Sequence, residues 1–260
     1  MAIHPNACIA PGATLGNNVT VGPFAVIDEN VTIGDNCVIG PHVHITGHTT
    51  IGANTQIHAG AVVGDSPQDV HYNNEVSYVD IGHDCVIREY VTIHRGTEEG
   101  SRTIIGNHVM LMAFSHVGHN CILEDHVIVA NASLLAGRVT VGEKAFVSAG
   151  CMIHQFVRIG RLAMIGGDNA IGQDVPPFCL LQTREILGVN LVGLRRAEIS
   201  DKARSALHQA VKIYFFQELP RINAVEKIKA EIEMCPEVQE FIDFVMSTKR
   251  GIMSGKQPHA

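Results

Sequence analysis

The 260-residue sequence contains no tryptophan, and only 5% of its residues are aromatic. The scarcity of large rings predicts a core too narrow to hold them. Charged residues are also scarce, at 17%, and the net charge of -7 argues against a general nucleic-acid-binding protein. No apolar run approaches the roughly 20 residues that a membrane helix needs. These absences favour a protein with a narrow core and no membrane-spanning segment.

The first residues, MAIHPNACIAPG, lack the basic and apolar regions of a secretory signal peptide. The sequence therefore predicts a cytoplasmic protein. Seven cysteines are present, and four of them (Cys37, Cys85, Cys121 and Cys151) occupy equivalent small positions in a repeat. We expect these four to be reduced core residues rather than metal ligands or disulfide partners.

An aliphatic residue returns at every sixth position from Ile3 to Ile171, and only Asp69, Glu75 and Glu99 interrupt the series. A period of six fits neither the 3.6 of a helix nor the 2 of an isolated strand. Each hexad supplies two inward positions, and three hexads close a triangular coil. The repeat therefore predicts a β-solenoid with 18 residues per coil and parallel strands about 4.8 Å apart.

Two polar stretches, at 65–80 and 96–103, break the repeat, which resumes in phase after each. We expect both to leave the solenoid as loops, and loops on rigid scaffolds often carry function. The adjacent prolines at 176–177 end the repeat. The sequence thus predicts a mainly β domain over residues 1–190 and an α-helical domain over residues 191–260.

Three helices are expected in the C-terminal domain. Apolar residues at helical spacing predict a first helix that begins near Ser200 and ends before a proline at position 220. Asn223 with Glu226 resembles a capping box and predicts the start of the second helix. Pro236 suits the first turn of a third helix, which would end at Gly251. We expect this domain to cap the solenoid.

The 18-residue period also predicts a cleft. Gly137 lies one coil above His119, and Gln155 lies one coil above Gly137. A glycine above an imidazole leaves open space and an exposed backbone N–H. His154 places a second imidazole beside this space, and His116 flanks the same corner of the coil. We expect a polar cleft built from stacked coils.

Six short motifs follow one another along the chain: PQD at 67–69, VTIHRGT at 91–97, HVGH at 116–119, HQF at 154–156, QDVPP at 173–177 and GVN at 188–190. Together they resemble the UDP-N-acetylglucosamine O-acyltransferases of lipid A biosynthesis, over essentially the whole chain. These are hexapeptide-repeat transferases, whose fold is a left-handed parallel β-helix. The resemblance implies a homotrimer that moves a 3-hydroxyacyl chain from acyl carrier protein to the 3-hydroxyl of UDP-N-acetylglucosamine, without a cofactor or a metal.

The resemblance also implies roles for individual residues. His119 would be the general base, and the backbone N–H of Gly137 would stabilise the oxyanion. Asp69 would bind the sugar, and Gly167 would leave room for a long acyl chain. The full set of substrate-binding positions implied by the family is Gln68, Asp69, His71, His116, His154, Gln155, Gly167, Asn190, Arg195 and Arg196.

Several positions depart from the family pattern. Asn120 follows the base where an aspartate is usual, so we expect another group to orient the imidazole. Arg138 replaces a common histidine, Val192 an acidic residue, and His71 a lysine. The segment 181–187 is shorter than usual. These departures leave open whether the acceptor carries a hydroxyl or an amine at carbon 3.

Three alternatives stay open from the sequence. The first is a related N-acyl- or acetyltransferase that uses another sugar nucleotide or coenzyme A. The second is a zinc enzyme resembling the γ-class carbonic anhydrases, with His116, His119 and His154 as ligands. The third is a non-catalytic scaffold.

Basic residues also gather near the C-terminus and suit docking of an acidic carrier protein: Arg195, Arg196, Lys202, Arg204, Lys212, Arg221, Lys227 and Lys229.

Overall fold

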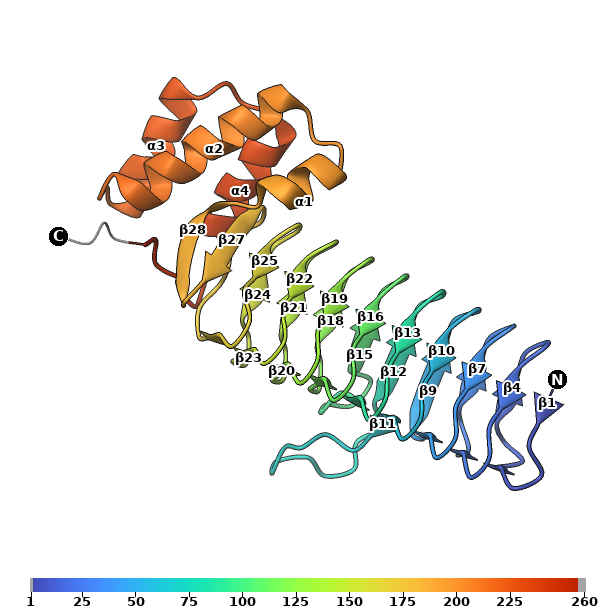
Figure 1. The fold of residues 1–260 in the computed structure, drawn as a ribbon. Helices are drawn as coiled ribbons and strands as arrows, with labels where there is room; N and C mark the ends of the chain where they lie inside the picture. Colours follow the sequence, from blue (N-terminus) through green and yellow to red (C-terminus); the bar gives the residue numbers. More distant parts are fainter. Residues whose placement is uncertain (1, 257–260) are drawn as a thin grey trace.

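The computed structural model describes residues 2–256, in which three sheets form the sides of a solenoid capped by helices (Figure 1). The first sheet has eleven strands: β1 (Ala2–Ile3), β4 (Thr20–Val21), β7 (Val38–Ile39), β10 (Gln56–Ile57), β13 (Val86–Ile87), β16 (Met110–Leu111), β19 (Ile128–Val129), β22 (Phe146–Val147), β25 (Met164–Ile165), β27 (Cys179–Gln182) and β28 (Glu185–Val189). All its pairings are parallel except that of β27 with β28.

The second sheet has nine strands: β2 (Cys8–Ile9), β5 (Val26–Ile27), β8 (His44–Ile45), β11 (Val62–Asp65), β14 (Thr92–His94), β17 (His116–Val117), β20 (Leu134–Leu135), β23 (Met152–Ile153) and β26 (Ala170–Ile171). The third has eight: β3 (Thr14–Leu15), β6 (Thr32–Ile33), β9 (His48–Ile51), β12 (Tyr78–Ile81), β15 (Arg102–Ile105), β18 (Ile122–Leu123), β21 (Thr140–Val141) and β24 (Arg158–Ile159). Strands of one sheet come from successive coils, as the hexad repeat predicts.

The repeat explains both the core and the corners. The aliphatic residue of each hexad points inward, and Ile27, for example, is only 1% exposed. The corners need a left-handed backbone conformation, which asparagine tolerates better than most residues. Asn18, Asn36 and Asn54 adopt it at successive coils, and their side-chain amides form a ladder of 3.2 Å hydrogen bonds. The expected buried cysteines, including Cys121, are free thiols in this core.

The two loops account for the in-phase interruptions. Gln56 pairs with Val86, 30 positions further on instead of 18, and Val86 pairs with Met110, 24 positions further on. The insertions are therefore two hexads and one hexad long. The loops span 66–77 and 95–101. The predicted first loop, 65–80, was therefore too long at both ends. The predicted second loop, 96–103, began and ended too late. Strands β12 and β15 already begin inside the predicted ranges.

The C-terminal domain contains α1 (Leu191–Arg196), α2 (Asp201–Phe216), α3 (Arg221–Glu231) and α4 (Pro236–Met246). Ser200 caps α2, since its side chain accepts a hydrogen bond from the backbone N–H of Ala203. The short helix α1 was not predicted. The predicted capping box at Asn223 is wrong, because α3 begins directly after Pro220 and places Asn223 inside its first turn.

The predicted third helix ends early. It stops at Met246 instead of Gly251, and the following segment returns to the end of the solenoid, where Ile252 pairs with Asp174. Asp174 is 1% exposed and forms a 3.0 Å ion pair with Arg158. Its carboxylate also accepts a hydrogen bond from Thr248. These polar contacts fix the helical domain to the last coil. Within residues 2–256, no helix combines the length and apolarity that a membrane span requires.

Candidate active site

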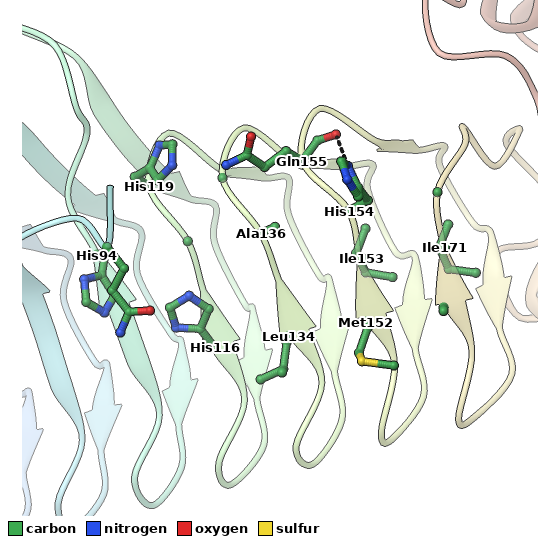
Figure 2. Close-up of a pocket in the computed structure, with 15 residues that line it drawn as sticks. His94, His116, His119, Leu134, Ala136, Met152, Ile153, His154, Gln155 and Ile171 are labelled. Carbon is green, nitrogen blue, oxygen red and sulfur yellow. Dashed lines mark hydrogen bonds between the residues drawn. The ribbon is translucent and has the colours of Figure 1, made fainter. Parts of the chain in front are cut away.

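A cavity of about 640 Å³ lies over the second sheet, where β17, β20, β23 and β26 stack (Figure 2). One end is polar, and the strip beside it is apolar. The polar lining consists of Gln68, His94, His116, His119, His154 and Gln155. The apolar lining consists of Leu134, Ala136, Met152, Ile153, Ala170 and Ile171. Such a lining can hold a molecule with a polar head and a long apolar chain.

The predicted juxtaposition of His119 and Gly137 is present. The Arg138 backbone N–H donates to the carbonyl of His119 at 2.8 Å, which stacks the two corners directly. His119 is 6% exposed, and its ring fills the space where a side chain at position 137 would stand. Within residues 2–256, the N–H of Gly137 has no hydrogen-bond acceptor. The corner therefore combines a buried imidazole with an unused backbone donor.

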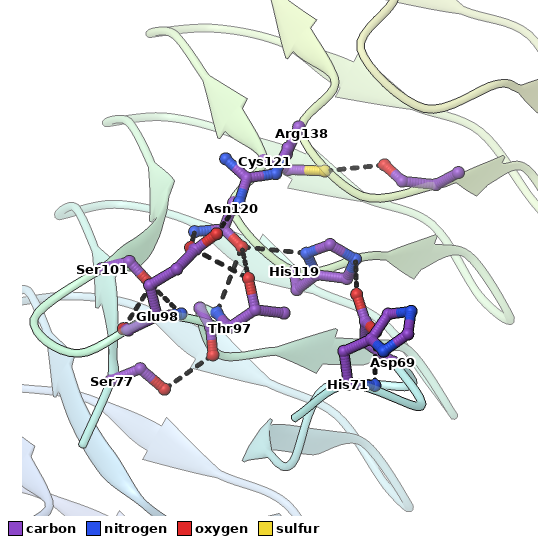
Figure 3. Close-up of polar contacts among 12 residues, drawn as sticks. Asp69, His71, Ser77, Thr97, Glu98, Ser101, His119, Asn120, Cys121 and Arg138 are labelled. Atoms are coloured by element: carbon purple, nitrogen blue, oxygen red, sulfur yellow. Dashed lines mark hydrogen bonds and ion pairs between the residues drawn. The ribbon is translucent and has the colours of Figure 1, made fainter. Parts of the chain in front are cut away.

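Asn120 corrects one expectation. From the sequence, a group other than Asn120 was expected to orient the His119 ring. Instead, the side-chain oxygen of Asn120 lies 2.9 Å from Nδ1 of His119, so Asn120 itself is the orienting partner (Figure 3). A carbonyl oxygen can only accept, which places the ring hydrogen on Nδ1 and the lone pair on Nε2. The Thr97 backbone N–H also donates to this oxygen, at 3.2 Å. An amide can therefore replace the usual carboxylate here.

The first loop brings Asp69 to the other side of the ring. Its carboxylate oxygen lies 3.8 Å from Nε2 of His119, and its second oxygen accepts the backbone N–H of His71 at 2.9 Å. Arg95 holds this loop in place, because its guanidinium donates to the carbonyl of Gly64 at 2.9 Å and to the Tyr72 hydroxyl at 3.1 Å. The side chain of His71 itself lies on the exposed part of the loop.

His94 and His116 form the floor of the polar end. Their rings meet edge to face with centroids 5.2 Å apart, and Nδ1 of His116 lies 2.8 Å from the Thr92 hydroxyl. Burial, together with repulsion by His94 and His119, lowers the pKa of His116 to about 4. His116 is therefore neutral near pH 7. His94 lines the cavity although it was not among the predicted site residues; its place in the VTIHRGT motif was the available signal.

The far side of the polar end contains His154 and Gln155. Nδ1 of His154 lies 3.2 Å from Nη2 of Arg250, whose guanidinium also donates to the carbonyl of Gly172 at 3.0 Å. Arg250 follows α4, 96 positions after His154 in the chain. Arg250 could not be predicted from the sequence, because no repeat spacing or motif connects it with His154 and only the folded C-terminal segment brings the two together.

Six predicted residues lie outside the cavity lining of this chain: Asp69 and His71, described above, and Gly167, Asn190, Arg195 and Arg196. Gly167 is at the turn before β26, on the opposite edge of the second sheet from His119. Asn190 caps α1, since its side chain accepts from the N–H of Gly193 at 3.0 Å and donates to a carbonyl at 2.9 Å. Arg195 and Arg196 are exposed on α1, without an ion pair inside residues 2–256.

The zinc alternative is not supported by the geometry of one chain. Among residues 2–256, the only metal-ligating side chains whose donor atoms gather within 4.8 Å are His83, Asp84 and His108. They lie at another corner of the solenoid, His83 and Asp84 between β12 and β13 and His108 between β15 and β16. The histidines that the alternative requires do not converge in this way.

Comparison with known proteins defines the class. A family model described as bacterial transferase hexapeptide (six repeats) matches residues 30–65 and 102–137. The first segment ends where the first loop begins, and the second begins where the second loop ends. The chain is thus a hexapeptide-repeat transferase, folded as a left-handed parallel β-helix with a C-terminal helical domain.

More specific matches define the family. A model described as UDP-N-acetylglucosamine O-acyltransferase, domain 2, matches residues 174–253. The acyl-[acyl-carrier-protein]–UDP-N-acetylglucosamine O-acyltransferase of Synechocystis is 45% identical over 78% of this chain and 75% of its own, and that of Anaeromyxobacter is 40% identical over 97% and 99%. The crystal structure of the Bacteroides fragilis UDP-N-acetylglucosamine acyltransferase is 38% identical, with a TM-score of 0.94 over 96% of this chain and 99% of its own. The chain belongs to this O-acyltransferase family.

Proposed function

We propose that the chain transfers a 3-hydroxyacyl group from acyl carrier protein to the 3-hydroxyl of UDP-N-acetylglucosamine, the first step of lipid A biosynthesis. The observation that carries this proposal is the buried ring of His119. Its Nδ1 is hydrogen-bonded to the side-chain oxygen of Asn120, and its Nε2 lies beneath Gly137. A neutral imidazole held in that tautomer is suited to remove a proton from a weakly acidic alcohol.

In the proposed reaction, Nε2 of His119 takes the proton of the sugar hydroxyl as its oxygen attacks the thioester carbonyl carbon. The negative charge that develops on the carbonyl oxygen is stabilised by the free N–H of Gly137. When the intermediate collapses, the carbon–sulfur bond breaks and the imidazolium returns its proton to the leaving thiolate. No covalent acyl-enzyme and no cofactor enter this sequence, because the thioester already supplies an activated acyl group.

The rest of the cavity suits the two substrates. Asp69 can accept a hydrogen bond from another sugar hydroxyl, since its carboxylate is beside the base. The strip of Leu134, Met152 and Ala170 along the second sheet can bury an acyl chain. The nucleotide would be bound by Asn190, Arg195 and Arg196. In a homotrimer, these side chains would lie near the boundary between two subunits or reach across it. The exposed charges on α1 also suit an acidic carrier protein.

The test is an assay of the purified protein with UDP-N-acetylglucosamine and a series of 3-hydroxyacyl carrier proteins, with products identified by mass. The same donors are offered to the UDP-sugar that carries an amine at carbon 3, and the acyl-coenzyme A thioesters are offered to both acceptors. We expect an O-acyl product from the carrier-protein donors. Preference for the amine or for coenzyme A would replace the proposed substrates, and no product from any pair would reject acyl transfer.

A further inference from the structure

The orientation of one amide decides whether His119 can act as a base. If the side-chain oxygen of Asn120 faces Nδ1, that nitrogen keeps the hydrogen and Nε2 is free to accept a proton. If the amide is rotated by half a turn, its NH2 group faces Nδ1. The hydrogen then moves to Nε2, which can no longer take a proton from the acceptor. An aspartate would not present this choice, because both of its oxygens accept.

The Thr97 hydroxyl lies 2.9 Å from the Asn120 side-chain oxygen but can donate or accept, so it fits either orientation. Two other contacts fix the Asn120 amide in the first orientation. The backbone N–H of Thr97 can only donate, and it lies 3.2 Å from the side-chain oxygen of Asn120. The carboxylate of Glu98 can only accept, and it lies 3.4 Å from the side-chain nitrogen. The rotated amide would place two donors together at Thr97 and two acceptors together at Glu98. Both residues belong to the second loop, 95–101 (Figure 3).

Glu98 is itself held in place from the next coil. Its carboxylate forms an ion pair with Arg138, the residue directly after Gly137, and the guanidinium lies 5.8 Å above the ring of Phe156. Desolvation opposes ionisation of Glu98, but the hydrogen bond from Thr97 and the charge of Arg138 outweigh it and lower its pKa below the usual range. Glu98 is therefore an anion at neutral pH. The two departures from the family pattern, Asn120 and Arg138, are thus joined through this one carboxylate.

We propose that Glu98 and Arg138 are positioning residues for the base, which act by holding the Asn120 amide in the orientation that accepts the Nδ1 hydrogen of His119. Neither side chain lines the cavity, so both act through Asn120. Two residues of the second loop, Thr97 and Glu98, would then help to position the base. This inference rests on the proposed general-base function of His119.

A double-mutant cycle at positions 98 and 120 tests the proposal. Asn120→Asp places two carboxylates one hydrogen bond apart, and we expect kcat to fall about tenfold. Glu98→Gln alone keeps an acceptor for Asn120 and should cost about threefold or less. In the double variant, the new amide at 98 can donate to the new carboxylate at 120. We therefore expect the double variant to recover to within about threefold of the wild type.

The pH profile gives a second readout. In the double variant a carboxylate faces Nδ1 and favours the imidazolium, so the acid limb of kcat should move to higher pH. The charged or titratable neighbours Asp69, His116 and Arg138 are the same in both proteins. Glu99→Gln is the matched control, since Glu99 is on the same loop but accepts from the backbone N–H of Val76 instead; it should leave kcat unchanged.

The proposal would be overturned if the effects of the two single substitutions on kcat simply multiplied, so that the double variant was no more active than Asn120→Asp. It would also be overturned if the acid limb of the pH profile of kcat did not shift in the double variant. Thermal melting of each variant separates loss of structure from loss of positioning. All rates are compared with the wild-type transferase rate. A wild type without activity would instead reject the proposed function, so the two failures are distinguishable.

Discussion

The ring of His119 occupies the space into which residue 137 would extend a side chain: a Cβ atom built on Gly137 would stand 2.2 Å from Nε2. The glycine is not required by its backbone, because it is outside the left-handed region that accounts for other glycines in the chain. It is required by the neighbouring imidazole. This relationship connects the 18-residue coil to the chemistry, since only stacked corners bring the base beneath the amide.

Gly137→Ala should therefore abolish most activity without unfolding the protein. The added methyl group would displace the ring from beneath the N–H, and loss of one such interaction costs about 10²–10³-fold in kcat. The control is Gly12→Ala, whose added Cβ would meet Glu29 at an ordinary 3.5 Å. Steady-state kinetics with thermal melting of both variants checks the prediction. An alanine variant as active as the control would contradict it.

Arg95→Ala should weaken sugar-nucleotide binding. Arg95 connects the first loop to the solenoid through Gly64, Ser66 and Tyr72, so its loss frees the segment that positions Asp69. We expect the KM for UDP-N-acetylglucosamine to rise about tenfold, with a smaller change in kcat, as for the loss of charged hydrogen bonds. Arg88→Ala is the control, because among residues 2–256 the Arg88 guanidinium pairs only with its neighbour Glu89. Equal KM values for the two variants would remove the proposed role of the loop anchor.

The buried ring of His116 should make stability depend on pH. The folded protein keeps this ring neutral down to about pH 4, whereas the unfolded chain takes up a proton below its ordinary pKa of 6.5. The unfolded state binds more protons in this window, so the free energy of unfolding should fall as the pH falls from 6.5 to 4. His116→Gln should reduce that slope in urea titrations at fixed protein concentration. Identical slopes for wild type and variant would show that the ring titrates normally.

Gly167→Met should shorten the preferred donor. Gly167 is on the edge of the second sheet opposite His119, so an acyl chain that crosses the sheet from the base ends near it. A long side chain there would fill the end of that path, and each excluded methylene forfeits about 0.8 kcal/mol of burial. Ratios of kcat/KM for long and short 3-hydroxyacyl carrier proteins give the answer. An unchanged ratio would place the end of the acyl path elsewhere.

The sequence predicted what the repeat controls. The hexad series from Ile3 to Ile171 determines the coils, and its multiple of 18 alone places Gly137 over His119. Features that depend on folded, non-repeating segments were missed or wrong: helix α1, the return of the chain at Ile252, and the contact of Arg250 with His154. No periodicity links these positions to their partners.

The role of Asn120 was also mispredicted from the sequence. An amide in place of a carboxylate suggested that the imidazole lacked its usual partner. In the structure the amide oxygen lies 2.9 Å from Nδ1 of the ring, and Thr97 and Glu98 contact the two ends of the amide. These residues come from a loop 22 to 23 positions earlier, outside the repeat. Residue identity alone could not predict the orientation of an amide that a separate loop controls.

The rate of His119→Ala at saturating UDP-N-acetylglucosamine and 3-hydroxyacyl carrier protein tests the central claim most directly. We expect kcat to fall roughly 10²–10⁴-fold while the melting temperature and the KM values stay near those of the wild type, because the imidazole acts on the proton in the transition state. The His42→Ala variant, altered at an exposed corner between β7 and β8 that does not line the cavity, should keep full activity. A His119→Ala variant within tenfold of the wild-type kcat would contradict general-base catalysis by this residue.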